Sequence, residues 1–244
     1  MNELYLDIGN SFLKLANQHG ESWQLLYDGR TNTVDSLVEI IKRSEEPMRL
    51  YVSSVRKDLF RDLKDSLDNI PVRLFDVSDI PKGKLDYDTP ETFGFDRFLV
   101  CLGAWSTEGT DTVVVDSGSA CTVDMMTADG VYRGGVIMPG LDLLHGAIED
   151  YLPELPVSER KIPERYPGKS TGECLEWGVN GTYLAAISGF VERYRKEYPG
   201  ALIFLTGGDS ERLSSWFSGQ IDATVDRNLI WKGMKRFRKM VEAG

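Results

Sequence analysis

The sequence predicts an α/β fold of two similar lobes, and two observations support this prediction. A short motif, Asp-x-Gly followed by Asn or Ser, occurs at residues 7–10 and again at residues 116–119. Around each copy the chain reads as strand, turn, strand, turn, strand. We interpret this as a structural duplication, with a first lobe of residues 1–111 and a second lobe of residues 112–244.

Apolar periodicity predicts the elements of the first lobe. Residues 4–7, 12–16 and 23–27 are strand-like runs separated by turn signals, which indicates a three-stranded antiparallel meander. Apolar residues at helical spacing follow at 37–41 and 59–67, and strand-like runs follow at 50–55 and 72–77. The expected order is therefore β-β-β-α-β-α-β, with a further helix around residues 98–105.

The second lobe begins with strand-like runs at residues 113–116, 122–126 and 131–138, followed by a helical pattern at 141–152. Residues 153–167 hold four of the ten prolines, so we expect a surface loop there. Helical spacing returns at 171–194, a strand is expected at 201–205, and a helix should start near Asp209. A basic amphipathic helix at 229–241 completes the prediction.

Composition excludes several classes of protein. The chain has 244 residues, 41% of them hydrophobic, which is enough for a sizeable core. A formal charge of −10 argues against a nucleic-acid-binding groove. The three cysteines lack C-x-x-C spacing, and neither a signal-peptide pattern nor a stretch of 18 apolar residues occurs. We expect a cytoplasmic protein that binds no nucleic acid and no membrane.

The first Asp-x-Gly turn has the composition of a phosphate-binding segment. Gly9 would let backbone N–H groups approach a polyphosphate, and Asn10, Ser11 and Lys14 add donors and positive charge. Asp7 would suit a phosphate-bound Mg²⁺. The alternative is an ordinary hairpin whose polar side chains satisfy their own backbone.

The second copy strengthens this hypothesis, because two such turns facing across a cleft could hold one nucleotide from both sides. A solvated turn carboxylate remains the alternative for Asp116. We interpret Cys121 as a packing residue, since its neighbours are strand-like and no histidine pairs with it. Glycine pairs at 134–135 and 207–208 could admit a nucleobase or ribose, or could simply form turns.

Residues 87–97 carry a candidate catalytic carboxylate. Gly94 precedes a helix, and Asp96 falls in its first turn, where N–H groups could hold the carboxylate ionised. Phosphoryl transfer to an alcohol needs a carboxylate near the hydroxyl and cations around the phosphoryl group, which Asp96 and Arg97 could supply in part. The alternative is a helix cap with a surface ion pair.

Six motifs occur in the order and spacing of the type III pantothenate kinases, so the chain resembles this family over nearly its whole length. They are Asp7-Ile8-Gly9-Asn10-Ser11-x-x-Lys14, Tyr87-x-x-Pro90-x-x-x-Gly94-x-Asp96-Arg97, Asp116-x-Gly118-Ser119-Ala120-x-Thr122-x-Asp124, Gly134-Gly135-x-Ile137-x-Pro139-Gly140, Gly168-Lys169-Ser170-Thr171 and Thr206-Gly207-Gly208. The family belongs to the acetate and sugar kinase, heat-shock protein and actin superfamily. The resemblance implies two ribonuclease H-like (actin-like) lobes with an ATP cleft between them.

The resemblance also implies the function and its residues. The reaction would be phosphorylation of pantothenate by ATP, the first step of coenzyme A biosynthesis, with Asp96 as the proton acceptor. The other implied contacts comprise ATP binding by Asp7, Ile8, Gly9, Asn10, Ser11, Phe12, Leu13, Lys14 and Ser119, substrate binding by Tyr87, Gly94, Phe95, Asp96, Arg97 and Thr171, and a monovalent cation, K⁺ or NH₄⁺, at Asp116. Mg²⁺ would accompany ATP, and a homodimer would complete the substrate pocket.

Two departures from the family pattern and two rival functions accompany this hypothesis. Ser119 stands where threonine is common, and Phe95 stands where a smaller residue is common. The rivals are a kinase for another small alcohol and a non-catalytic ATP-binding regulator. Sequence leaves open whether residues 160–165 of the proline-rich loop close over the site or stay solvated.

Overall fold

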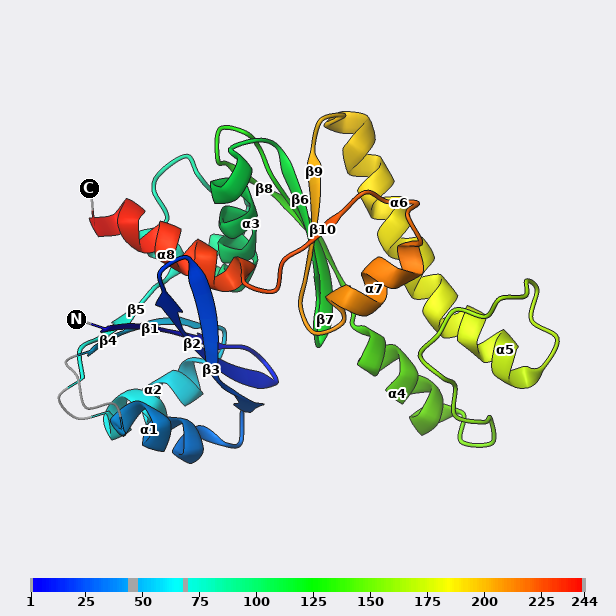
Figure 1. The fold of residues 1–244 in the computed structure, drawn as a ribbon, viewed down its shortest axis with the longest axis horizontal. Coiled ribbons are helices and arrows are strands. Elements are labelled where there is room, and N and C mark those ends of the chain that lie inside the picture. Colours follow the sequence, from blue (N-terminus) through cyan, green and yellow to red (C-terminus); the bar gives the residue numbers. More distant parts are fainter. Residues whose placement is uncertain (1, 44–47, 68–69, 243–244) are drawn as a thin grey trace. The chain divides into compact units, whose positions relative to one another are not determined.

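The structure, a computed structural model, describes residues 2–43, 48–67 and 70–242. Its contacts group the chain into two compact units (Figure 1). The first comprises Met1–Thr107 together with Asn228–Gly244, and the second comprises Glu108–Arg227. The expected second lobe, residues 112–244, included the C-terminal helix, whereas the contacts of that helix place it with the first unit.

The first unit contains the predicted order β-β-β-α-β-α-β. Its elements are β1 (Asn2–Ile8), β2 (Phe12–His19), β3 (Ser22–Arg30), α1 (Val34–Lys42), β4 (Met48–Ser54), α2 (Lys57–Ser66) and β5 (Val72–Leu74). The sheet order is β3-β2-β1-β4-β5, in which β1 is antiparallel to β2 and parallel to β4. The predicted meander is therefore confirmed.

The last strand of this sheet is shorter than predicted. The apolar run at 72–77 indicated one strand, but β5 ends at Leu74 and a 3₁₀ turn follows at Val77–Asp79. The Asp76 carboxylate accepts a hydrogen bond from the Ser78 amide at 3.0 Å and so caps this turn. Because Asp76 caps a turn there, the chain leaves the sheet early.

Side chains alternate between the two faces of the first sheet. Leu4, Leu6 and Ile8 point into a core shared with Leu37 of α1 and Leu63 of α2. On the other face, Glu3 forms an ion pair with Arg238 of α8 (Leu229–Glu242), and α8 packs closely against α3 (Phe95–Glu108). A Cβ on Gly233 would lie only 1.9 Å from the Leu99 carbonyl oxygen, so the two helices touch through their backbones.

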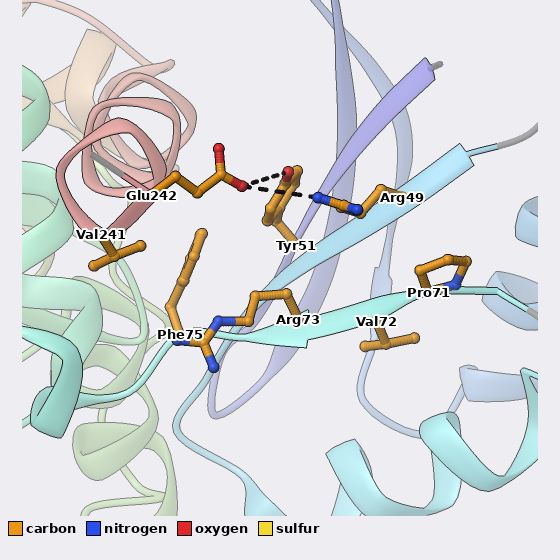
Figure 2. A pocket seen from close by; sticks show the side chains of 8 residues that line it. All are labelled: Arg49, Tyr51, Pro71, Val72, Arg73, Phe75, Val241 and Glu242. Carbon is orange, nitrogen blue, oxygen red and sulfur yellow. Dashed lines mark hydrogen bonds and ion pairs between the residues drawn. The ribbon is translucent and has the colours of Figure 1, made fainter. Parts of the chain in front are cut away.

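A cavity of about 300 Å³ lies beside the C-terminal end of α8 (Figure 2). It is lined by Arg49, Tyr51, Pro71, Val72, Arg73, Phe75, Val241 and Glu242. None of the predicted site residues lines it. Arg49 pairs in register with Glu3, whereas Asp7 pairs with Ser53 four residues along, so the cavity lies at the opposite end of these strands from the Asp7 turn.

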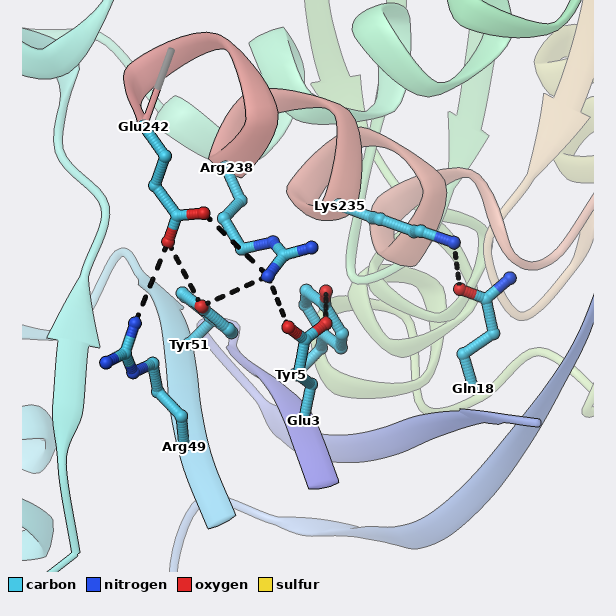
Figure 3. Close-up of polar contacts among 8 residues, drawn as sticks. All are labelled: Glu3, Tyr5, Gln18, Arg49, Tyr51, Lys235, Arg238 and Glu242. Atoms are coloured by element: carbon cyan, nitrogen blue, oxygen red, sulfur yellow. Dashed lines mark hydrogen bonds and ion pairs between the residues drawn. The ribbon is translucent and has the colours of Figure 1, made fainter. Parts of the chain in front are cut away.

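Polar contacts fasten α8 to the strands of the first unit (Figure 3). Arg238 forms an ion pair with Glu3, and its guanidinium lies 5.3 Å from the centre of the Tyr51 ring. Tyr51 donates a hydrogen bond to Glu242 at 3.2 Å. Phe237 packs edge-on against Phe75, with ring centres 5.3 Å apart. These contacts explain why α8 groups with the first unit.

The second unit repeats the topology of the first. Its elements are β6 (Thr112–Ser117), β7 (Ala120–Met126), β8 (Tyr132–Pro139), α4 (Leu141–Tyr151), α5 (Thr171–Glu176), a π-helical turn (Trp177–Gly181), α6 (Thr182–Glu197), β9 (Leu202–Thr206), α7 (Ser210–Phe217) and β10 (Thr224–Val225). The order β10-β9-β6-β7-β8 has β6 antiparallel to β7 and parallel to β9. The prediction of a duplicated two-lobed α/β fold is confirmed.

Three local features complete the fold. Residues 153–167 contain neither helix nor strand, as their prolines predicted. The π-helical turn and the two-residue strand β10 were not expected, because periodicity does not distinguish a π turn from an α-helix and β10 is too short to show alternation. Among the described residues, helices fall short of the length and apolar character needed to cross a membrane.

Candidate functional site

The first Asp-x-Gly turn lies at the carboxyl end of β1. Asp7 pairs across the sheet with Lys14 on β2 and with Ser53 on β4. The Gly9 amide donates to the Phe12 carbonyl at 2.9 Å, which closes the turn. A carboxylate, a lysine and a glycine turn therefore meet at one strand end, the arrangement expected of a phosphate and Mg²⁺ site.

The residues predicted to bind ATP in this segment differ in whether their side chains are accessible to a ligand. Ile8 and Leu13 are each 1% exposed and belong to the hydrophobic core, so only their backbones could reach a ligand. Asn10 is exposed, and Ser11 and Lys14 are half-buried. Phe12 is 41% exposed, and the Arg30 guanidinium lies 5.8 Å from the centre of its ring.

The candidate catalytic carboxylate lies in the first turn of α3, as predicted. Asp96 Oδ1 accepts a hydrogen bond from the Arg97 amide at 3.0 Å, which orients the carboxylate. A Cβ on Gly94 would lie 2.8 Å from that same oxygen, so glycine leaves the carboxylate its space. The N-terminus of a helix favours negative charge, which suits a carboxylate in this first turn.

Aromatic packing holds the neighbours of Asp96. Arg97 is 6% exposed, and its guanidinium lies 5.7 Å from the centre of the Phe93 ring. Phe93 packs against Tyr87 with ring centres 4.9 Å apart. The structure thus gathers Tyr87, Asp96 and Arg97 within the first unit. Phe95 instead packs into the core against Phe237 at 5.0 Å, so only its backbone could meet a substrate.

The second Asp-x-Gly turn occupies the equivalent position in the second unit. Asp116 pairs with Thr122 on β7 and Thr206 on β9. Gly207 has a positive φ of 88°, and a Cβ there would lie 2.5 Å from Asp116 Oδ1 and 2.4 Å from the Ser117 carbonyl oxygen. Only glycine suits this place, since it permits both the backbone conformation and the close approach.

Neighbouring elements converge on the same strand ends. The Gly140 amide, just before α4, donates to the Ser119 carbonyl at 3.2 Å, and the Asp209 amide donates to the Ser117 carbonyl at 3.1 Å. Burial raises the pKa of the Asp209 carboxyl, while the nearby Arg212 opposes this shift. The sequence predicts only a helix start at Asp209, because its neighbours at this edge are distant in the sequence.

The structure does not bring Thr171 to this edge of the second unit. Thr171 is exposed at the first position of α5, where the preceding Ser170 hydroxyl accepts a hydrogen bond from the Glu173 amide at 3.2 Å. Figure 1 shows α5 well apart from the strands of this unit. Asp116 and Ser119 are thus neighbours, and Thr171 is separate from them.

The described residues contain no group of three or more His, Cys, Asp or Glu side chains that could hold a metal ion. Mg²⁺ in kinases commonly needs only one or two carboxylates besides the substrate phosphates, so Asp7 alone is compatible with it. Beside Gly207, Asp116 Oδ1 and the Ser117 carbonyl oxygen come together. Such oxygens are suitable ligands for a monovalent cation.

Cys121 is a packing residue, as interpreted from the sequence. It is fully buried, and burial raises the pKa of its thiol to about 12. A thiol with that pKa stays protonated at neutral pH and is a poor nucleophile.

Comparisons with known proteins point to one family. Residues 3–193 match the family described as type III pantothenate kinase. A type III pantothenate kinase from Phocaeicola vulgatus is 31% identical over 237 residues, which cover 96% of each chain.

Solved structures show the same fold. A protein from Campylobacter jejuni, provisionally described as a Baf family transcriptional activator, has a TM-score of 0.68 at 23% identity and covers 99% of this chain and 100% of its own. A protein from Listeria monocytogenes, provisionally described as an N-acetylmannosamine kinase, has a TM-score of 0.57 at 10% identity, with 98% and 99% covered. With the family match over most of its length, this chain belongs to the type III pantothenate kinases.

Proposed function

We propose that Asp96 is the proton acceptor in the ATP-dependent phosphorylation of pantothenate, the reaction of this kinase family and part of coenzyme A biosynthesis. The observation that carries this assignment is the position of Asp96 in the first turn of α3, where the Arg97 amide orients its carboxylate. Asp96 accepts the proton of the primary hydroxyl as that oxygen attacks the γ-phosphorus of ATP. The products are 4′-phosphopantothenate and ADP.

The remaining contacts divide between the two units. We assign the ATP contacts to residues 7–14 and to Ser119, with Ile8 and Leu13 acting through their backbones because their side chains are buried. Tyr87, Gly94, Phe95, Arg97 and Thr171 are assigned to pantothenate. Arg97 supplies a positive charge next to Asp96, which suits the carboxylate of pantothenate.

Two kinds of cation fit the residues present. Asp7 would hold Mg²⁺ together with the ATP phosphates, and Asp116 with the Ser117 carbonyl would hold K⁺ or NH₄⁺. When bound, these ions offset the negative charge of the phosphates during transfer. The ATP cleft expected between the lobes stays a prediction.

A homodimer is part of the proposal. Thr171 lies apart from Asp116 and Ser119 in its own unit, which supports a role in the site of a second copy. Leu143 and Tyr151 on α4 are 58% and 84% exposed, and Val157 in the following loop is 76% exposed. We assign these exposed apolar side chains to the association surface. A cytoplasmic location fits Cys174, an exposed free thiol.

The test is an assay of ADP formation with pantothenate, in potassium chloride and in ammonium chloride. Asp96→Asn should lower kcat by about 10²-fold to 10⁴-fold, because general-base catalysis contributes that much. Asp88→Asn, which changes an exposed carboxylate in the same segment, is the matched control and should keep parental kcat. Parental turnover in Asp96→Asn would refute the role of Asp96, and an inactive parent would refute pantothenate as the substrate.

A further inference from the structure

A buried polar network joins the proline-rich loop (residues 153–167) to the rest of the second unit. Its centre is Asn180, which is 0% exposed and lies in the π-helical turn. Asn180 Nδ2 donates to the Glu159 carbonyl at 2.8 Å and to the Lys161 carbonyl at 2.7 Å. The two bonds hold the backbone on both sides of one residue, Arg160.

A histidine completes the network. His145 of α4 is 3% exposed, and its Nε2 lies 2.8 Å from Asn180 Oδ1. Since that oxygen can only accept, Nε2 donates, and Nδ1 lies within hydrogen-bond distance of the Ser158 hydroxyl, at 3.0 Å. Residues 158–161 are therefore held at Ser158, at Glu159 and at Lys161.

The Arg160 side chain leaves this network toward the sheet. Its guanidinium forms an ion pair with Asp142, in the first turn of α4. That turn starts at Gly140, whose amide donates to the Ser119 carbonyl. Both Arg160 and Asp142 are also close enough to Asp209 for their charges to influence the pKa of its carboxyl. A loop residue is thus brought to the strand ends where Asp116 and Ser119 lie.

The ion pair itself does not explain this construction. The Arg160 and Asp142 side chains are 42% and 70% exposed, and exposed pairs contribute about 0–1 kcal/mol to stability. A pair this weak does not account for the buried Asn180 amide and the buried His145, which together fix the backbone around Arg160. π-helical turns, such as the one that carries Asn180, frequently occur at functional sites.

We propose that Arg160 exchanges Asp142 for an anionic group of a substrate at the carboxyl end of β6, and that Asn180 positions Arg160 for this contact. The inference rests on the kinase activity proposed above. A guanidinium binds phosphate or carboxylate oxygens in pairs, so the group is a phosphate of ATP or the carboxylate of pantothenate. Proximity to Ser119, an assigned ATP contact, favours the phosphate.

Steady-state kinetics with each substrate varied in turn tests the contact. Arg160→Ala should raise the KM for ATP about tenfold, the loss expected for about 1.4 kcal/mol of binding. Its thermal midpoint should stay parental, because only an exposed ion pair is lost. Arg160→Lys should restore part of the affinity, since it keeps the charge without the paired donors. A rise confined to the KM for pantothenate would assign the carboxylate as the anion.

Two further variants separate binding from structure. Asp142→Asn removes only the resting partner, so the KM for ATP should stay parental or fall. Arg195→Ala removes a surface ion pair with Glu192 and a hydrogen bond to the Asp222 carbonyl, and it serves as the control with parental kinetics. If Asp142→Asn raised KM as much as Arg160→Ala does, the pair would be a structural unit and the proposal would be wrong.

A double-mutant cycle tests the role of Asn180. Asn180→Ala should raise the KM for ATP in the parental background and add nothing in the Arg160→Ala background, because it acts through Arg160. Additive effects would overturn this role, and parental kinetics of Arg160→Ala with both substrates would overturn the contact. Calorimetric binding of the ATP analogue AMP-PNP gives a readout without turnover, so the contact can be judged even if pantothenate is not phosphorylated.

Discussion

The two Asp-x-Gly turns occupy equivalent places in two sheets of the same topology, yet they have different surroundings. Asp7 faces Lys14 across the strand pair, whereas Asp116 faces Thr122. On the parallel side, Asp7 pairs with Ser53 and Asp116 with Thr206. The duplication preserved the carboxylate and the hydroxyl, while a lysine occurs only in the first copy.

The two turns have equally open glycines but differ in what packs against them: a Cβ on Gly118 of the second turn would lie 3.5 Å from the Ala120 carbonyl oxygen, an ordinary contact. A Cβ on Gly9 would meet the Phe12 carbonyl oxygen at 3.3 Å, an approach that a small shift relieves. Around the second turn, a Cβ on Gly140 would lie 2.1 Å from the Gly118 carbonyl oxygen. The second turn is therefore packed closely by the segment that precedes α4, and among the described residues no such backbone neighbour meets Gly9.

The largest expected effect concerns this packing. Gly140→Ala should lower the free energy of unfolding by about 3 kcal/mol, because backbone atoms must move to relieve the overlap. Gly9→Ala should cost about 1 kcal/mol or less, since its nearest contact, at 3.3 Å, needs a shift of only a few tenths of an ångström. Urea denaturation of both variants measures the difference. Equal costs would mean that the two turns are equally crowded, which contradicts the comparison.

The next effect concerns charge. Lys14→Ala should raise the KM for ATP by about tenfold to a hundredfold, because a charge-assisted bond to phosphate contributes about 1.5–3 kcal/mol. Thr122→Ala, at the equivalent position of the second unit, should change that KM by less than about threefold. Steady-state kinetics with ATP as the varied substrate measures both. If Thr122→Ala had the larger effect, the second turn would be the main phosphate site.

The smallest effect concerns pH. Burial raises the folded-state pKa of Asp209, so the unfolded chain releases this proton first and stability falls as pH rises from the ordinary aspartate value through the folded one. In the first unit, the hydrogen bond from Arg56 lowers the pKa of Asp58 to about 2. The stability that Asp58 contributes is therefore present above the ordinary aspartate pKa and is lost as pH falls toward 2.

Asn variants at these two positions should change stability relative to the parent in opposite directions as pH rises. Relative to the parent, Asp209→Asn should gain stability as pH rises from 3 to 7, and Asp58→Asn should lose a small amount over the same range. Denaturation midpoints at several pH values measure both. If the stabilities of both variants relative to the parent changed in the same direction as pH rises, burial would not be the main influence on the pKa of Asp209.

Much of the fold was readable in the sequence because its signals are local. Alternation in residues 4–7 and 12–16 specified the first strands, and prolines between 153 and 167 excluded regular structure there. The spacing of Asp7 and Asp116 from their glycines located both turns and revealed the duplication. Asp96 was placed in the first turn of a helix by the glycine before it and the apolar period after it.

Other features depended on contacts between distant residues. Phe237 and Arg238 join α8 to the first unit through partners more than 150 residues away. The bonds of Asn180 to His145 and to the carbonyls beside Arg160 span from 19 to 35 residues. Sequence by itself determined where strands end and where carboxylates stand, since these follow from neighbours along the chain. Only the tertiary structure decided which loop residue reaches those strand ends, because packing between separate elements sets that position.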